Sequence, residues 1–429
     1  MGRSIAVALG GLALLACTQA SAADFANAIR AVSDTVQRTY TFLHENPELG
    51  KHETKANAHL KAALLSLGFT EFVESSSAPT AVIAVLDSGK PGPVVALRAE
   101  MDARPLEAGK AEPVNHVPRS RVDGVMHNCG HDVHAAILLG TAAILSANKD
   151  RIAGKVVFLF QPAEEVAGGA DDIVREAILP RLGVERIFAQ HVAPAMPVRT
   201  IAIAPGYTLA GSHSFSLKIK GRGSHAASPR DGTDTPLVAA RMAMALSEYP
   251  ARRLDIANKP VVISVTRLLA DGKANNVIPA DAELHGTIRS FENIDVSENG
   301  QASLKDSLAA FVERMATEAG VQHDWSLRPG APPTRNDAAL FDQVVRPLMR
   351  SWPGVLDTHP GRGMFAEDFA YYTQATQSLY FSLGVARDGR GTAGVHTAEF
   401  DVHPAAFTEG IRLMTSLAVI GTTGQMDWR

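Results

Sequence analysis

Cysteine is almost absent from this chain of 429 residues, which contains only Cys17 and Cys129. Cys17 lies in an N-terminal segment with the features of an export signal, so a chain that loses this segment keeps a single thiol. A single thiol excludes an internal disulfide, even in a compartment that permits one. The fold must therefore be stabilised by burial of apolar side chains rather than by cross-links.

The chain also lacks an excess of positive charge. It has 41 Lys and Arg against 45 Asp and Glu, a formal net charge of −4, and no basic stripe interleaved with aromatic residues. These features exclude a nucleic-acid-binding function. A hydrophobic content of 46% and a charged content of 20% are typical of a soluble globular enzyme, and the length predicts two domains.

Apolar runs of membrane-spanning length are missing as well. The one apolar run of note, residues 5–16, follows Arg3 and leads into small residues up to Ala23. This pattern predicts a signal peptide over residues 1–23 and an exported protein, periplasmic or secreted, that begins at Asp24. The alternative is a lipoprotein anchored at Cys17, since Leu-Leu-Ala-Cys resembles a lipobox. Neither reading gives a transmembrane protein.

The densest chemistry lies in residues 126–134, Met-His-Asn-Cys-Gly-His-Asp-Val-His. If this segment is extended, Cys129 and His131 project to the same side, and Gly130 lets the backbone bend. Thiol and imidazole groups this close together indicate a metal site, where a lone cysteine would also be protected. The alternative is that the segment is only a helix N-cap near Asp132, with histidines that bind nothing. If the segment does bind a metal, Asp132 can either cap the helix or accept a ring N–H from a ligating histidine.

Further candidate ligands follow predicted strands. Glu164 and Glu165 come just after a continuous apolar run at residues 156–160, and a second strand at 186–190 ends at His191. Open α/β sheets place their sites at this edge. One carboxylate can bind a metal while the other stays basic enough to accept a proton. His396 lies in a loop-like segment near the C-terminus.

With these residues in order, the sequence resembles the M20 peptidase and amidohydrolase family, in its aminoacylase-like branch of hippurate and auxin-conjugate hydrolases. The resemblance covers nearly all of the chain after the predicted signal. The landmarks that carry it are residues 97–103 (Leu-Arg-Ala-Glu-Met-Asp-Ala), 127–132, 160–165, 191–192, 221–227 (Gly-Arg-Gly-Ser-His-Ala-Ala), 276–279 (Asn-Val-Ile-Pro), 286–289 (Gly-Thr-Ile-Arg), 367–369 and 396–397.

The resemblance implies a role for each matched residue. Two divalent metal ions, zinc, manganese or cobalt, are expected on Cys129, His131, Glu165, His191 and His396. The same resemblance implies that Glu164 is the general base, that His225 is catalytic and acts across a dimer interface, and that Asn276 and Arg289 bind substrate. The Cys129 thiolate can bridge the two metals.

The sequence departs from the family pattern near these ligands. Glu100 stands where Asp is usual, Arg104 where Leu is common, and Asn128 where Ala is frequent. None of the three replaces an expected ligand or the base. We therefore expect Arg104 and Asn128, which lie near ligand segments, to affect specificity rather than catalysis.

The pattern of helices and strands predicts the fold. An α/β catalytic domain of the phosphorylase/hydrolase-like class, with a central mixed sheet, is expected in two parts, 24–208 and 329–429. A ferredoxin-like α/β sandwich at 209–328 is expected as an inserted lid and dimerisation domain. The predicted helices are 26–38, 54–67, 132–147, 236–249 and 303–318, and the predicted strands are 81–86, 94–98, 156–160, 186–190, 215–219, 261–267, 282–290 and 322–327.

The combined prediction is an exported, dimeric metal-dependent hydrolase that cleaves the amide of N-acyl-amino acids or related conjugates, with Glu164 activating the attacking water. A carboxypeptidase or dipeptidase with the same residues is the first alternative. Two others are a catalytically silent binding protein and a hydrolase that uses Cys129 as nucleophile. The last leaves Glu164, Glu165, His191 and His396 without a shared purpose.

Overall fold

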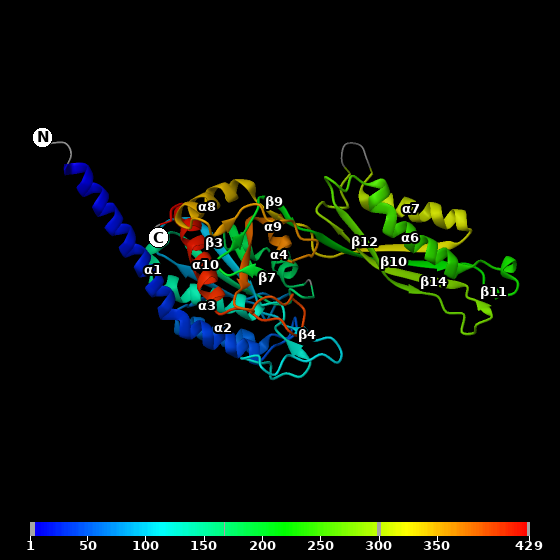
Figure 1. Ribbon diagram of the computed structural model, residues 1–429, viewed down its shortest axis with the longest axis horizontal. Helices are drawn as coiled ribbons and strands as arrows, with labels where there is room; N and C mark the ends of the chain where they lie inside the picture. The colour runs from blue at the N-terminus through cyan, green and yellow to red at the C-terminus, as the bar shows by residue number, and fades with distance from the viewer. Residues whose placement is uncertain (1–4, 167, 298–301, 427–429) are drawn as a thin grey trace. The chain divides into compact units, whose positions relative to one another are not determined.

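The computed structural model describes residues 5–166, 168–297 and 302–426, with side chains described from Asp24 onward. The chain divides into two compact units (Figure 1). Unit 1 comprises Met1–Gly206, Arg335–Pro360 and Tyr371–Arg429, and unit 2 comprises Tyr207–Thr334 and Gly361–Ala370.

Unit 1 is built on an eight-stranded mixed sheet with the order β1-β2-β6-β3-β7-β18-β8-β17. The four central strands β6, β3, β7 and β18 are parallel to one another. Their apolar runs are buried on both faces, as is usual for central parallel strands. The strands are β1 Glu71–Val73, β2 Val82–Asp87, β3 Val94–Glu100, β6 Lys155–Gln161, β7 Val184–Pro197, β8 Ile201–Ala202, β17 Leu356–Asp357 and β18 Gln377–Ala386.

Helices cover this sheet and supply the rest of its core. Helix α3, His131–Ala147, packs against β3 and against α10, Ala405–Thr423. Helix α2, Thr54–Ser66, and helix α8, Ala338–Ser351, complete the layers around one apolar core. Helix α3 is buried along nearly all of its length, so its first turn is held rigidly where the ligand segment enters it.

Helix α1 spans Ile5–Glu45 and therefore extends beyond the predicted helix at 26–38 in both directions. The predicted signal peptide at 1–23, with Cys17, lies outside the described side chains. Export and the lipid anchor stay predictions. Among the described residues, no helix has both the length and the apolar character that a membrane span requires.

Strand β7 corrects the prediction that a strand ends at His191. It continues to Pro197, because its partner β18 pairs with it past His191, whose register partner is Ser382. The other neighbour, β3, pairs with β7 only as far as Ala189. His191 therefore lies beyond the last β7 residue that pairs with β3, while its own strand continues.

The segment around Gly130 is not extended, and the bend that the sequence allowed at this glycine is present. Gly130 has φ +88°, and helix α3 begins at the next residue, His131. A Cβ on Gly130 would lie 2.5 Å from Cγ2 of Val192. A left-handed glycine turn, not strand alternation, therefore brings Cys129 and His131 to one place, and it packs directly on β7.

Unit 2 contains a four-stranded antiparallel sheet of order β12-β14-β10-β15 with two helices packed on it. Its elements follow the order strand-helix-strand-strand-helix-strand, which is that of the expected sandwich. Alternate residues of β10 are buried against the helices. The elements are β10 Gly211–Lys220, α6 Thr235–Arg253, β12 Val261–Leu269, β14 Asp281–Ser290, α7 Leu304–Ala319 and β15 Gln322–Pro329.

One segment of unit 2 was not expected from the sequence. Gly361–Ala370 groups with unit 2, although the sequence placed it in the second part of the catalytic domain. The reason is backbone pairing: Gly363 N donates to Thr208 O at 2.9 Å, and Ala210 N donates to Gly363 O at 3.0 Å. The other boundaries between the two units lie at 206/207 and 334/335. The sequence predicted them at 208/209 and 328/329.

The Gly130 turn generates a stability prediction. The free energy of unfolding of Gly130→Ala is expected to be about 3 kcal/mol lower than that of the wild type. The reason is that the strain of a left-handed backbone adds to the overlap between the new Cβ and Val192. Urea denaturation measures this change. Gly124→Ala is the matched control, because Gly124 has φ +72° but no atom within 4 Å of the added Cβ; it is expected to lose about 1 kcal/mol. Equal losses in the two variants would contradict the packing role of Gly130.

Candidate metal centre

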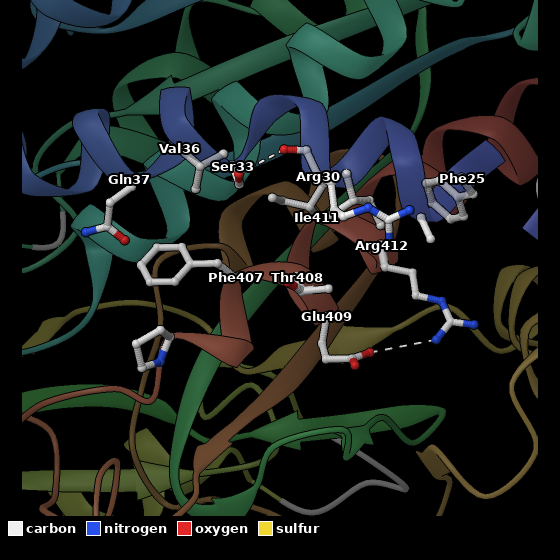
Figure 2. Close-up of a pocket in the computed structure, with 13 residues that line it drawn as sticks. Phe25, Arg30, Ser33, Val36, Gln37, Phe407, Thr408, Glu409, Ile411 and Arg412 are labelled. Atoms are coloured by element: carbon white, nitrogen blue, oxygen red, sulfur yellow. Dashed lines mark hydrogen bonds and ion pairs between the residues drawn. The ribbon is translucent and has the colours of Figure 1, made fainter. Parts of the chain in front are cut away.

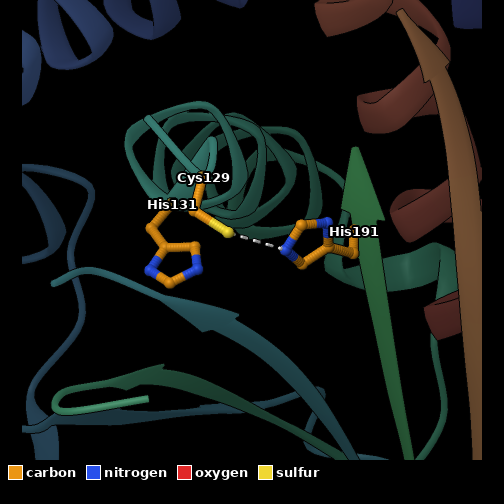
Figure 3. A group of neighbouring side chains, drawn as sticks. All are labelled: Cys129, His131 and His191. Atoms are coloured by element: carbon orange, nitrogen blue, oxygen red, sulfur yellow. Dashed lines mark hydrogen bonds between the residues drawn. The ribbon is translucent and has the colours of Figure 1, made fainter. Parts of the chain in front are cut away.

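Five side chains expected as ligands come together in unit 1 as two groups of three. Cys129, His131 and His191 form one group, and Cys129, Glu165 and His396 form the other; within each group the donor atoms lie within 4.8 Å of one another. Figure 3 shows the first group, in which Cys129 Sγ lies 3.5 Å from His191 Nε2. Cys129 belongs to both groups, so its sulfur stands between them.

The ring of His131 is oriented by Asp102. Its Nδ1 lies 2.9 Å from the Asp102 carbonyl oxygen and 3.2 Å from Asp102 Oδ1, so this nitrogen is the donor. His131 Nε2 is buried and has no hydrogen-bond partner within the described residues. A buried nitrogen that points into a group of thiol and carboxylate side chains is the arrangement expected of a metal ligand.

The ring of His191 is oriented by the backbone of its own strand. Its Nδ1 donates to the carbonyl oxygen of Val192 at 2.8 Å, which leaves Nε2 directed at Cys129. Val192 N in turn donates to His134 Nε2 at 2.9 Å, and His134 Nδ1 donates to Glu100 Oε2 at 2.8 Å. The Glu100–His134 pair therefore fixes the strand that carries the ligand.

The carboxylates lie where β6 ends, as the sequence predicted. Glu165 Oε1 lies 3.4 Å from His396 Nε2 and 4.0 Å from His131 Nε2, while Glu164 Oε2 lies 3.9 Å from His131 Nε2. Burial alone would raise the pKa of Glu165. Its neighbours His396, His131 and Arg104 lower the pKa by more than burial raises it, and the result is about 2. The Glu165 side chain is therefore charged at neutral pH, as a metal ligand would need to be.

His396 reaches the cluster from the far end of the chain. Its backbone has φ +68°, and its N–H donates to the Asn128 carbonyl oxygen at 2.6 Å. This hydrogen bond ties the C-terminal loop to the Cys129 segment. This backbone contact explains how His396, which is half-exposed and lies in a loop, is held beside the more buried donors Cys129 and Glu165.

The donor set fits divalent metal ions. Burial would lower the pKa of His131, but its hydrogen bond to the Asp102 carboxylate raises it, so this carboxylate favours positive charge in the pocket. Burial raises the pKa of the Cys129 thiol, which is the opposite of what a cysteine nucleophile requires. Coordination of a metal would deprotonate this thiol. The geometry therefore favours the metal interpretation of Cys129 over the nucleophile.

His225, Asn276 and Arg289 all lie in unit 2. His225 on β11, Ser224–His225, and Asn276 beside β13, Val277–Ile278, bring His225 Nε2 and Asn276 Nδ2 within 3.4 Å of each other. Arg289 lies on β14 opposite Ser212 of β10 and is half-buried. Unit 2 thus brings His225 and Asn276 together and holds Arg289 separately on its sheet.

The sequence did not reveal how Asp132 is used. Gly130, not Asp132, is the N-cap of α3, and no side chain caps the helix, so the N-cap alternative is wrong. Asp132 Oδ2 instead lies 2.7 Å from His44 Nδ1, and His44 Nε2 lies 2.9 Å from Glu112 Oε1. Asp102, rather than Asp132, orients the candidate ligand His131. Asp102 lies in the motif at residues 97–103, but its position in the sequence does not predict the contact with His131, 29 residues away.

A groove of about 440 Å³ between α1 and α10 lies apart from these residues (Figure 2). Apolar side chains line it, among them Phe25, Val36, Phe407 and Ile411, together with the ion pair of Glu409 and Arg412. Its lining contains no histidine, cysteine or pair of carboxylates. The groove therefore offers no group of candidate metal ligands.

Most of the chain matches known proteins. Residues 96–419 match the model of peptidase family M20/M25/M40.

The chain belongs to this family.

Two relatives and one solved structure indicate its place in the family. The chain is 34% identical to thermostable carboxypeptidase 2 of Saccharolobus solfataricus, over 85% of this chain and 89% of that protein. It is 32% identical to an N-acetylcysteine deacetylase of Bacillus subtilis, over 88% and 94%. The crystal structure of the Bacillus subtilis YXEP protein, a dinuclear metal binding peptidase of the M20 family, superposes with a TM-score of 0.74 and 29% identity, over 91% and 99%. The chain is thus a metal-dependent amidohydrolase or peptidase, with a mixed α/β fold.

The His44 network generates a pH prediction. Burial lowers the pKa of His44, but Asp132 and Glu112 raise it to about 9 from 6.5. Protonated His44 therefore stabilises the folded protein fully below pH 6.5, and this contribution to the free energy of unfolding is lost as the pH rises through about 9. In urea denaturation, His44→Gln is expected to lose about 3 kcal/mol more relative to wild type at pH 6 than at pH 10.

The matched control for this measurement is His116→Gln. His116 lies 3.3 Å from the same Glu112 but is partly exposed, so its deletion is expected to change stability by less than about 1 kcal/mol at both pH values. A destabilisation of His44→Gln that does not vary with pH would contradict a charged His44.

Proposed function

We propose that this chain cleaves the amide bond of N-acyl-amino acids or related amino-acid conjugates, with two divalent metal ions held at the Cys129 cluster. The observation that carries this proposal is the pair of three-donor groups that share Cys129, with Glu164 beside them. One ion would be held by Cys129, His131 and His191, and the other by Cys129, Glu165 and His396. The relatives named above, an N-acetylcysteine deacetylase and a dinuclear metal binding peptidase, support it.

Metal ions at this site would polarise the scissile carbonyl and acidify a water molecule. Glu164 is the side chain placed to take the proton of that water, since it lies next to the ligand Glu165 without belonging to either Cys129-containing group. The same carboxyl group can return the proton to the leaving amine, which completes the reaction as carboxylic acid and free amino acid. Thiolate and imidazole donors favour zinc or cobalt, and manganese is the third candidate.

We further propose that unit 2 is the substrate-binding lid and the dimerisation domain. His225 and Asn276 would contact substrate, with His225 assisting the oxyanion, and Arg289 would bind its carboxylate. The edge strand β12 supports a dimer contact, because its side chains Val262, Leu268 and Leu269 are 41–44% exposed and apolar. Sedimentation velocity is expected to give a dimer mass, and a monomer at all concentrations would contradict this.

Export is proposed from the N-terminal pattern alone. Mass spectrometry of the mature protein is expected to find Asp24 as the first residue, in a periplasmic or secreted fraction. A lipid-modified Cys17 would favour the anchored alternative. An intact N-terminus in the cytoplasm would contradict both.

A carboxypeptidase or dipeptidase is the second candidate, favoured by the 34% identity to a carboxypeptidase. Hydrolysis of a panel of N-acyl-amino acids, dipeptides and longer peptides distinguishes the two. The proposed function predicts higher kcat/KM on N-acyl-amino acids. A preference for peptides would establish the second candidate instead.

Metal removal and the general base are tested on the same panel. Chelated enzyme is expected to be inactive and to recover when zinc, manganese or cobalt is supplied, while Glu164→Gln lowers kcat by about 10²–10⁴-fold with metal present. Glu107→Gln is the matched control, since Glu107 is an exposed carboxylate outside the cluster.

Two outcomes would overturn the mechanism. Activity that survives chelation would exclude metal catalysis and return Cys129 to consideration as a nucleophile. Two bound metal equivalents without turnover of any substrate would indicate a binding protein.

A further inference from the structure

Arg104 makes a contact with the cluster that the proposed mechanism does not use. Its guanidinium forms an ion pair with Glu165 through Nη1 and Oε2. Arg104 stands where the family resemblance leads one to expect Leu. A charged side chain on an expected ligand therefore distinguishes this chain from the general pattern.

The two carboxylate oxygens of Glu165 lie in different surroundings. Oε2 is occupied by Arg104, whereas Oε1 is buried, has no hydrogen-bond partner within the described residues, and faces His396 Nε2 at 3.4 Å. The carboxylate torsion of a glutamate is broad and nearly two-fold, so nothing intrinsic to the side chain makes one oxygen face the cluster. The contact with Arg104 supplies that distinction.

The backbone of Arg104 is held firmly on both sides. Arg104 begins the short strand β4, Arg104–Pro105, and pairs with Met126 of β5, Val125–Met126, directly before the Cys129 segment. The preceding Ala103 N donates to Glu48 O at 2.8 Å. The guanidinium thus extends from an anchored backbone, and the side chain is 31% exposed.

Asp102, two residues earlier, holds the other end of Glu165. Its Oδ2 accepts the Glu165 backbone N–H at 3.0 Å, while its Oδ1 and carbonyl oxygen orient His131. The segment after β3 therefore fixes the backbone of Glu165 through Asp102 and its carboxylate through Arg104.

From this geometry we propose that Arg104 is a positioning residue that makes Glu165 a one-oxygen metal ligand. By occupying Oε2, the guanidinium prevents the carboxylate from binding a metal through both oxygens, and this keeps a coordination position available for the reaction. The planar fork of arginine suits a carboxylate oxygen better than the ammonium of lysine does. The inference rests on the proposed function, because it requires metal at this cluster.

The full-length enzyme loaded with cobalt tests the inference, because the visible absorption of Co²⁺ weakens as its coordination number rises. In Arg104→Leu, Oε2 is released, so the absorption is expected to fall below that of the wild type. Chelator competition is expected to show metal bound about tenfold more tightly, because one nearby positive charge is gone. At the same time kcat is expected to fall, with KM little changed. A merely structural defect would instead weaken metal binding.

Two further variants sharpen the comparison. Arg104→Lys keeps the positive charge and one donor, so it is expected to restore the metal affinity to within about threefold of wild type and to recover part of the absorption. Arg121→Ala is the matched control, because Arg121 lies in the same loop region and pairs with Glu45 at 2.9 Å, 71% exposed and outside the cluster. It is expected to leave affinity, spectrum and kcat unchanged.

The outcomes separate this inference from the proposed function. A wild-type chain that takes up no cobalt contradicts the proposed function and the inference together. A wild-type chain that binds two cobalt ions, with an identical spectrum and affinity in Arg104→Leu, contradicts the inference alone. A rise in KM without a spectral change would make Arg104 a substrate-binding residue and would also overturn it.

Discussion

The position of one sulfur atom governs the site of this protein. Cys129 Sγ belongs to both groups of donors, and it is held there by the left-handed turn at Gly130 that packs on Val192. The same Val192 neighbours His191 on β7, so the turn and the strand fix the sulfur and an imidazole against each other. If the sulfur moved, both groups would lose a donor at once.

Around this sulfur, two of the expected ligands, His131 and His191, are held in place by buried partners. Asp102 orients His131, and the Glu100–His134 pair fixes the strand of His191. Asp102 and the Val192 carbonyl oxygen accept from Nδ1 of His131 and of His191, so in both rings Nε2 faces the cluster. Other charged groups in the core of unit 1 are also paired, Arg98 with Glu100 and His44 with Asp132.

The sequence was informative wherever a pattern is local. Periodicity located β10, β12 and β14 to within a few residues, and the apolar run before Gln161 correctly put Glu164 and Glu165 at a strand end. It failed where distant segments decide. The extension of β7 past His191 depends on β18, and the inclusion of Gly361–Ala370 in unit 2 depends on pairing with residues 208–210. The partnership of Arg104 with Glu165 is likewise a contact between separate loops, and no spacing rule encodes it.

Metal stoichiometry tests the shared sulfur most directly. Equilibrium dialysis against zinc, followed by elemental analysis, would compare the wild type with His191→Ala, His396→Ala and Cys129→Ala. Two zinc ions are expected in the wild type, one in each histidine variant, and none in Cys129→Ala, because only Cys129 belongs to both groups. Two ions retained by Cys129→Ala, or both ions lost from a single histidine variant, would contradict this expectation.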